Sequence, residues 1–265
     1  MNGHKRMILQ TSDQWQKRNV NVQEKKKKLI KPKILIDGDI FAYRAAFSCD
    51  DQDVDDAIDK VDDLIQWTIY ACVLEYGVED YEVFLTGKGN FRYDLATTHP
   101  YKGNRKDVEK PQHLEAIRKH MINAWEAVVS KGEEADDLIG IAATEIGPEA
   151  IIVTVDKDML QIPCRHYNPT KGVHKIVSEE EGMKFFYKQV LTGDRADNIK
   201  GLYGVGPAKA EKIVADCVTE SDYYLECLHQ YGGEEDRVIE NARLLWLRRF
   251  PNQLWEPPQC VTDQV

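Results

Sequence analysis

The segment that most constrains the fold is AIIVTVD, residues 150–156, an apolar run without polar alternation. A strand with this pattern is covered on both faces, as strands in parallel sheets are. Three further strands are predicted at 33–36, 81–87 and 127–129, and helical patterns separate them. Strands that alternate with helices predict an α/β core built on a parallel sheet.

The helices are predicted from the spacing of apolar residues. Residues 53–76 carry apolar side chains at helical intervals, so the eight aspartates between 50 and 63 are assigned mostly to the solvated face and N-terminal flank of one helix. Further helices are predicted from Ile40, over 111–125, from Glu133, and over 179–191, 207–218, 221–230 and 234–249. No strong strand is expected after about residue 178, so a helical C-terminal subdomain is predicted to follow the core.

Composition excludes several classes of protein. The chain has no apolar run long enough to cross a bilayer, and its polar, lysine-rich start lacks the apolar core of a signal peptide. Its six cysteines form no CxxC pair, so neither a zinc site nor a disulfide framework is indicated. We therefore expect a cytoplasmic protein without a membrane partner.

The net charge of −10 is unevenly distributed along the chain. Residues 1–33 hold ten Lys/Arg and two acids, and 1–32 lack apolar periodicity. This segment is interpreted as a mobile basic arm, either a solvated tail or an accessory phosphate-binding arm. Because the remainder is acidic, binding to a polyanion is expected to depend on local basic surfaces and bridging metals.

Acidic residues recur where the predicted strands end. Asp37 ends the first strand, Asp156 and Asp158 end the apolar strand, and two further groups open a helix at 134–137 and precede a glycine-rich turn at 194–197. Ligands of parallel sheets gather at the carboxyl ends of strands. Converging carboxylates suit Mg²⁺ or Mn²⁺, and two such ions about 4 Å apart activate water and stabilise the leaving oxygen of a phosphodiester. Asp39 is assigned instead as the N-cap of the following helix.

The string IKGLYGVGPAKAEKIV, residues 199–214, fits a helix-hairpin-helix. Gly204 and Gly206 are expected to allow positive φ and close backbone approach, and Pro207 suits the first turn of a helix. Main-chain N–H groups of such an element hold phosphates without reading sequence. The alternative is a plain turn between packing helices.

A basic segment with interleaved aromatic residues follows the second strand. Its sequence, FRYDLATTHPYKGNRKDVEKP, offers cations for phosphates and rings that can stack on unpaired bases. Lys102 and Arg105 share a face if this segment is helical. The alternative is a solvated basic loop.

The ordered motifs LIDGD, YKGNRK, EEADD, VDKDML, GDRADNIKG and GVGPAKA resemble the 5′-nuclease family of flap endonucleases and 5′–3′ exonucleases, in particular the short bacteriophage replication exonucleases. The resemblance covers about residues 33–215. It implies a PIN-like, Rossmann-like core at 33–190 with an arch at 90–125, and a DNA-binding helix-three-turn-helix in 191–265. It further implies two Mg²⁺ or Mn²⁺ ions, a K⁺ ion at the hairpin, and cleavage of DNA at 5′ ends or flaps during phage replication and primer removal.

Roles carried over by motif are as follows. The metal positions are Asp37, Glu134, Asp136, Asp137, Asp156, Asp158, Asp194 and Asp197. Lys102 and Arg105 match the basic pair that meets the scissile phosphate. The other residues expected to contact DNA are Arg44, Arg92, Tyr101, Lys106, Lys200, Gly204, Gly206 and Lys209.

One position departs from the family pattern. The family usually has a further Asp after the second strand, where this chain has Thr86 and Gly87, and Asp39 is the residue that would compensate. Two alternative functions follow. One is a structure-specific DNA-binding protein with a weakened active site, and the other is a PIN-like ribonuclease, which the hairpin disfavours. An RNA–DNA hybrid substrate remains compatible with the nuclease.

Overall fold

The computed structural model describes residues 31–105 and 109–259. Most of the predicted basic arm, the predicted DNA contact Lys106, and Cys260 lie outside the described residues. From Pro32 onward the chain forms one compact unit, so the predicted boundary between 190 and 191 stays a prediction. None of the helices in the described ranges combines the length and apolar character that a bilayer crossing needs.

A sheet of six strands forms the centre of the described chain, in the order β3-β2-β1-β4-β5-β6. Its strands are β1 (Ile34–Asp37), β2 (Tyr81–Lys88), β3 (Val128–Lys131), β4 (Ile151–Val153), β5 (Arg165–Asn168) and β6 (Val173–Ile176). The first five strands run parallel, and β6 pairs antiparallel with β5. The carboxyl ends of β1, β2 and β4 therefore meet at one edge.

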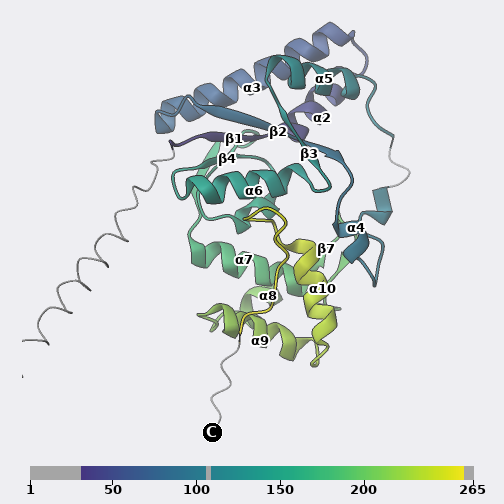
Figure 1. Cartoon of the computed structure of the whole chain (residues 1–265), viewed down its shortest axis with the longest axis vertical. Helices are drawn as coiled ribbons and strands as arrows, with labels where there is room; N and C mark the ends of the chain where they lie inside the picture. Colours follow the sequence, from purple (N-terminus) through teal and green to yellow (C-terminus); the bar gives the residue numbers. More distant parts are fainter. Residues whose placement is uncertain (1–30, 106–108, 260–265) are drawn as a thin grey trace, which may run out of the picture. The chain divides into compact units, whose positions relative to one another are not determined.

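Helices cover both faces of this sheet (Figure 1). Ile34 and Ile36 face a cluster with α2 (Gly38–Ser48), α3 (Val54–Tyr76) and α5 (Leu114–Ala124). Leu35, which points to the opposite face, packs in a second cluster with α6 (Ala135–Ile146). Both faces of β1 are thus buried, which is the physical reason why the apolar strands in this sequence show no alternation.

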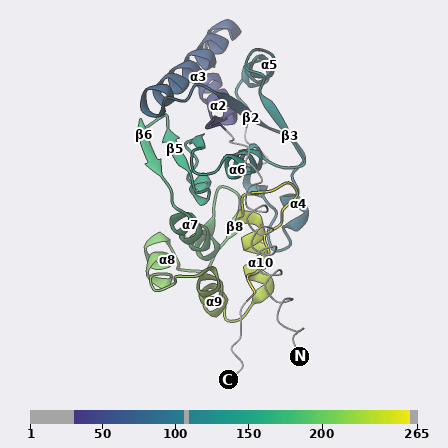
Figure 2. The ribbon, with the colours of Figure 1, turned by 60° about the vertical axis from the view of Figure 1, so that its left-hand side comes forward.

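The C-terminal helices share a separate core (Figure 2). They are α7 (Glu179–Thr192), α8 (Pro207–Ile213), α9 (Glu220–Gln230) and α10 (Glu235–Leu245). Tyr187 and Tyr223 stack in this core with ring centroids 5.4 Å apart. A two-stranded ribbon of β7 (Gly193–Asp194) and β8 (Ile199–Lys200) connects α7 to the turn before α8.

The α/β class, the parallel sheet and the helical C-terminal region are confirmed, and several details of the prediction are wrong. The sequence did not predict β5 and β6, nor the short strands β7 and β8 after residue 178. The predicted helix at 207–218 ends at Ile213. Asp37, not Asp39, is the N-cap of α2, and its side chain makes no capping hydrogen bond.

Candidate active site

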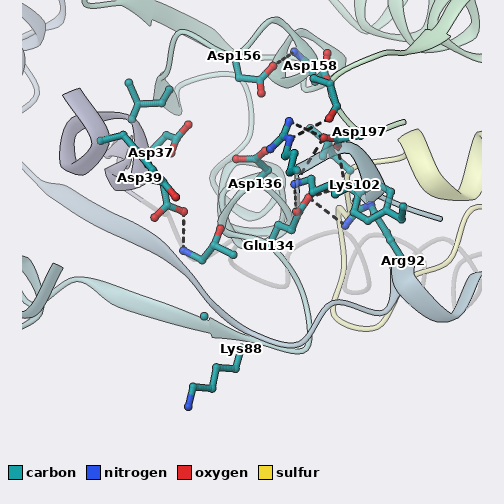
Figure 3. A pocket seen from close by; sticks show the side chains of 18 of the residues that line it. Asp37, Asp39, Lys88, Arg92, Lys102, Glu134, Asp136, Asp156, Asp158 and Asp197 are labelled. Atoms are coloured by element: carbon teal, nitrogen blue, oxygen red, sulfur yellow. Dashed lines mark hydrogen bonds and ion pairs between the residues drawn. The ribbon is translucent and has the colours of Figure 1, made fainter. Parts of the chain in front are cut away.

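A pocket of roughly 1300 Å³ lies at the carboxyl ends of β1, β2 and β4. Seven of the eight predicted metal positions line it (Figure 3). They come from five parts of the fold: the end of β1, the start of α6, the segment after β4, β7, and the turn after β7. These residues are Asp37, Glu134, Asp136, Asp156, Asp158, Asp194 and Asp197.

The carboxylates nearest β1 repel one another. Burial and the neighbouring Asp39 carboxylate raise the pKa of Asp37 to about 7, although Thr154 Oγ1 donates a hydrogen bond to Asp37 Oδ2 at 2.9 Å. Burial and the Asp37 carboxylate also raise the pKa of Asp136 well above its ordinary value. Anions in this situation are stabilised by a cation, and carboxylate oxygens are the donors that Mg²⁺ and Mn²⁺ prefer. The donor set therefore fits a hard divalent metal.

The acids near β4 and β7 have a protein cation between them. Lys157 Nζ lies 3.1 Å from Asp194 Oδ2 and 3.4 Å from Asp158 Oδ1. Burial and Asp156 raise the pKa of Asp158 to about 6. Burial also tends to raise the pKa of Asp194, but its hydrogen bond and ion pair with Lys157 outweigh burial and lower it. The sequence analysis missed Lys157, although its place between two acids in DKD was a usable signal.

Asp156 also makes an ordinary turn contact, because its Oδ1 accepts from the Asp158 N–H at 2.8 Å. In the described ranges, no three Asp, Glu, His or Cys side chains are arranged to hold one ion. Protein cations bridge several of the carboxylates instead. The assignment of individual metal ligands thus stays a prediction.

The predicted basic pair, Lys102 and Arg105, lines the same pocket. Lys102 forms an ion pair with Glu134, and Arg105 Nη2 lies 2.8 Å from Asp197 Oδ1. The two residues belong to different local structures, because Lys102 has a φ of 51° and precedes the 3₁₀ turn η1 (Gly103–Arg105). Burial lowers the pKa of Lys102, but Glu134 and Asp197 outweigh burial and raise it, so this lysine is protonated.

Tyr101 lies within the acid cluster. Its ring is buried, and its hydroxyl lies 2.7 Å from Asp197 Oδ2 and 3.0 Å from Glu134 Oε2. Tyr101 therefore ties two acids of the pocket together. The residue also lines the pocket, and its contact with DNA stays a prediction.

Arg92 and Asp137 form a buried ion pair. Arg92 Nη1 and Nη2 lie 2.6 and 2.8 Å from the two oxygens of Asp137, and the Arg92 side chain is 1% exposed. Arg92 also donates to the carbonyls of Leu244 and Trp246. Each residue is thus buried against the other, and the assignments of Asp137 as a metal ligand and of Arg92 as a DNA contact stay predictions.

Gly87 stands where the family pattern has an acid, and the backbone explains why. A Cβ atom at Gly87 would lie 1.9 Å from the carbonyl oxygen of Ser130, so no side chain fits without a backbone shift. The Asp39 carboxylate is close by: its Oδ2 accepts from the Thr86 N–H at 2.8 Å, and it pairs with Arg118. Nothing in the sequence marked Arg118 as a residue of this pocket.

The glycine-rich turn matches its prediction only in part. Gly204 has the expected positive φ of 72°, whereas Gly206 is extended at −97°. The close backbone approach involves Gly193 and Gly201 instead, since a Cβ at Gly193 would lie 2.3 Å from the Gly201 nitrogen. The other predicted DNA contacts, Arg44, Lys200 and Lys209, are exposed, so DNA contact there stays a prediction.

Comparison with known proteins is consistent with this site. The family described as 5′-3′ exonuclease, N-terminal resolvase-like domain, matches residues 32–190. A 5′-3′ exonuclease of Mycoplasma genitalium is 30% identical over 253 residues, covering 85% of this chain and 79% of that protein. The flap endonuclease Xni of Vibrio parahaemolyticus is 30% identical over 167 residues, 54% of this chain and 62% of Xni. The zinc-bound T5 5′-exonuclease shares the fold, with a TM-score of 0.63 and 17% identity over 81% of this chain and 89% of that chain.

Proposed function

Because this chain belongs to the 5′-3′ exonuclease family, we propose that it is a divalent-metal-dependent nuclease that cleaves DNA at or near 5′ ends or 5′ flaps. The observation that carries the proposal is the pocket itself. Seven of the predicted metal positions and the cations Lys102 and Arg105 line one cavity at the carboxyl edge of a parallel sheet. This combination provides ligands for metals beside groups that bind a phosphate.

The residues proposed to hold two Mg²⁺ or Mn²⁺ ions are the seven predicted metal positions that line the pocket. The raised pKa values of Asp37 and Asp136 support this assignment, because both acids are poorly stabilised as anions by the protein alone. When bound, such ions supply an activated water and stabilise charge on the leaving oxygen. Asp194, whose pKa is lowered by Lys157, is ionised over the whole neutral range.

Lys102 and Arg105 are proposed to bind the phosphate that is cut. The Arg105 side chain is 48% exposed, so its guanidinium can leave Asp197 for a phosphate oxygen, to which it can donate two parallel hydrogen bonds. Lys102 is less exposed and is held by its Glu134 partner, which orients its ammonium group at the pocket. Both then stabilise the charge that develops on the phosphate.

The C-terminal region is proposed to grip duplex DNA. The turn with Gly204 and Gly206, followed by α8, supports a helix-hairpin-helix in which main-chain N–H groups hold phosphates and carbonyls hold a K⁺ ion. Lys200 and Lys209 are exposed beside this turn. The biological role proposed with it is removal of primers in phage DNA replication, with an RNA–DNA hybrid as a further substrate.

The test is cleavage of 5′-labelled flap, nicked and blunt duplexes over a titration of Mg²⁺ and of Mn²⁺. We expect products with 5′-phosphate and 3′-hydroxyl ends. The double variant Asp156→Ala with Asp158→Ala should lose cleavage and keep most of its DNA binding. Asp59→Ala with Asp63→Ala, which removes two exposed acids of α3 outside the pocket, is the matched control.

Three results would overturn parts of the proposal. Full activity in the Asp156 and Asp158 double variant would remove these acids from the metal site. Tight binding of flap DNA without cleavage by the wild-type chain, at every metal concentration, would favour a structure-specific binding protein. Preferential cleavage of single-stranded RNA would favour a ribonuclease.

A further inference from the structure

We propose that Arg118 of α5 binds a phosphate of the DNA strand, on the side of the acid cluster away from Lys102. The inference rests on the proposed function and adds a contact that no motif in the sequence indicated. In Figure 3, Asp136 lies between Asp39, the partner of Arg118, and Lys102. A strand bound across the acids would thus meet cations on both sides.

Unused hydrogen-bond donors distinguish Arg118 from Arg92, the buried arginine of the pocket. Arg92 is 1% exposed and donates to both oxygens of Asp137 and to two backbone carbonyls, so the protein satisfies it. Arg118 is 18% exposed and has two protein acceptors, Asp39 Oδ1 and the carbonyl of Thr86. A guanidinium carries five N–H donors. Arg118 lines the pocket, so a ligand bound there can accept from its remaining donors.

The two acceptors also fix the position of the guanidinium. Asp39 itself accepts from the Thr86 N–H at 2.8 Å, so Asp39, Thr86 and Arg118 form a closed set of contacts at the end of β2. A charge held in this way loses little side-chain freedom when it binds a ligand. An arginine fixed by one carboxylate still offers the planar fork that phosphate oxygens accept.

The surrounding wall has the chemistry of a nucleotide-binding surface. Lys119 is exposed next to Arg118 and lines the same pocket. Leu114 and Ile122 of α5 line it as well, and Ile122 is 42% exposed. Cations beside an apolar surface suit a nucleic-acid strand, because the cations bind its phosphates and the apolar surface contacts its sugars and bases. A polyanion also needs such cations here, because the acids of the pocket repel it.

The test measures binding without metal, so that it does not depend on catalysis. A fluorescent 5′-flap duplex is titrated with protein in EDTA at several salt concentrations, and anisotropy gives Kd. Arg118→Met keeps the apolar stem and removes the charge. We expect Kd to rise about fivefold and the slope of log K against log salt to fall by about 0.7 to 0.9 in magnitude, the value for one lost phosphate contact.

Two further variants separate a phosphate contact from a change in local charge. Arg118→Met leaves Asp39 unpaired, whereas Arg118→Met with Asp39→Asn has the net charge of the wild type. The double variant should bind as weakly as Arg118→Met. Arg118→Lys should recover most of the salt slope. Lys60→Ala, which removes one exposed positive charge of α3 outside the pocket, should leave the slope unchanged.

Several outcomes would overturn the inference. They are an unchanged salt slope in Arg118→Met, recovery of binding in the charge-balanced double variant, or an equal loss in Lys60→Ala. Thermal unfolding in EDTA checks that each variant is folded, and the double variant Arg118→Met with Asp39→Asn carries the test if Arg118→Met is not. Failure here is distinguishable from failure of the proposed function, because the wild type would still cleave flap DNA.

Discussion

Two neighbouring aspartates at the start of α6 have opposite environments. Asp137 is fully buried and bound by both nitrogens of Arg92, at 2.6 and 2.8 Å. Asp136 lines the pocket, where burial and the Asp37 carboxylate raise its pKa well above the ordinary value. Successive residues of a helix point about 100° apart, so adjacent acids can serve different surroundings.

The difference separates structural from functional acids in this cluster. Arg92 joins α4 (Arg92–Leu95) to α6 through Asp137 and to the C-terminal segment through the carbonyls of Leu244 and Trp246. That ion pair engages both oxygens of Asp137. Asp37 and Asp136 form no ion pair with any described residue, and a buried anion without a partner is tolerated chiefly where function needs it.

The largest effect is expected at Asp136. Asp136→Asn keeps the shape and removes the charge, so single-turnover cleavage of a 5′-flap substrate with Mg²⁺ should fall about 10⁴-fold, roughly 5 kcal/mol of barrier. Because the change also removes repulsion with Asp37, the variant should unfold in EDTA at a temperature no lower than the wild type. Wild-type cleavage in this variant would place Asp136 outside the metal site.

The sequence predicted the core and the acids of the site because both depend on local patterns. Buried strands such as Ile151–Val153 carry unbroken apolar runs, and the acids follow directly after them. The hairpin β5–β6 was missed because RHYN and VHKI mix polar and apolar residues at the edge of the sheet, where one side chain in two can face solvent.

Pairings between distant residues were beyond the sequence. Arg92 meets Asp137 across 45 positions and the Leu244 carbonyl across 152. A basic segment with aromatic rings suggested DNA contact, and only the packed structure shows that Arg92 and Tyr101 face inward. The need for glycine at position 87 was also beyond the sequence, because it arises from a close approach to Ser130 on the neighbouring strand.

The next largest effect is expected at Asp137, the aspartate that is paired with Arg92. Asp137→Asn removes the carboxylate that binds both terminal nitrogens of the buried Arg92 guanidinium and leaves it Glu134 Oε2 at 3.9 Å, so the free energy of unfolding should fall by about 3 to 5 kcal/mol. Urea denaturation of the metal-free protein measures this loss, with Asp136→Asn as the matched control. Similar stability of the two variants would contradict the distinction between the adjacent acids.

Gly87 offers a smaller test of whether the pocket can accept another acid. In Gly87→Asp, the Cβ atom would lie 1.9 Å from the Ser130 carbonyl oxygen, so the β2–β3 pairing must shift. We expect a loss of about 2 kcal/mol in unfolding free energy and no gain in cleavage. Gly206→Ala is the control, because Gly206 is extended and its added Cβ meets nothing within 4 Å. A gain in cleavage by Gly87→Asp would mean that the site lacks an acid it can hold.

The smallest effect concerns how pH acts on the unpaired acids. Burial and Asp39 raise the pKa of Asp37 from 3.8 to about 7 in the folded protein, so its contribution to stability is fully present below about pH 4 and is lost as the pH rises through 7. In EDTA, Asp37→Asn should therefore unfold at a higher temperature than the wild type at pH 8 and show no advantage at pH 4. Asp59→Asn, an exposed acid of α3, should follow the wild type at both pH values. Parallel pH profiles of Asp37→Asn and the wild type would show that Asp37 is already neutralised by the protein, as Asp137 is by Arg92.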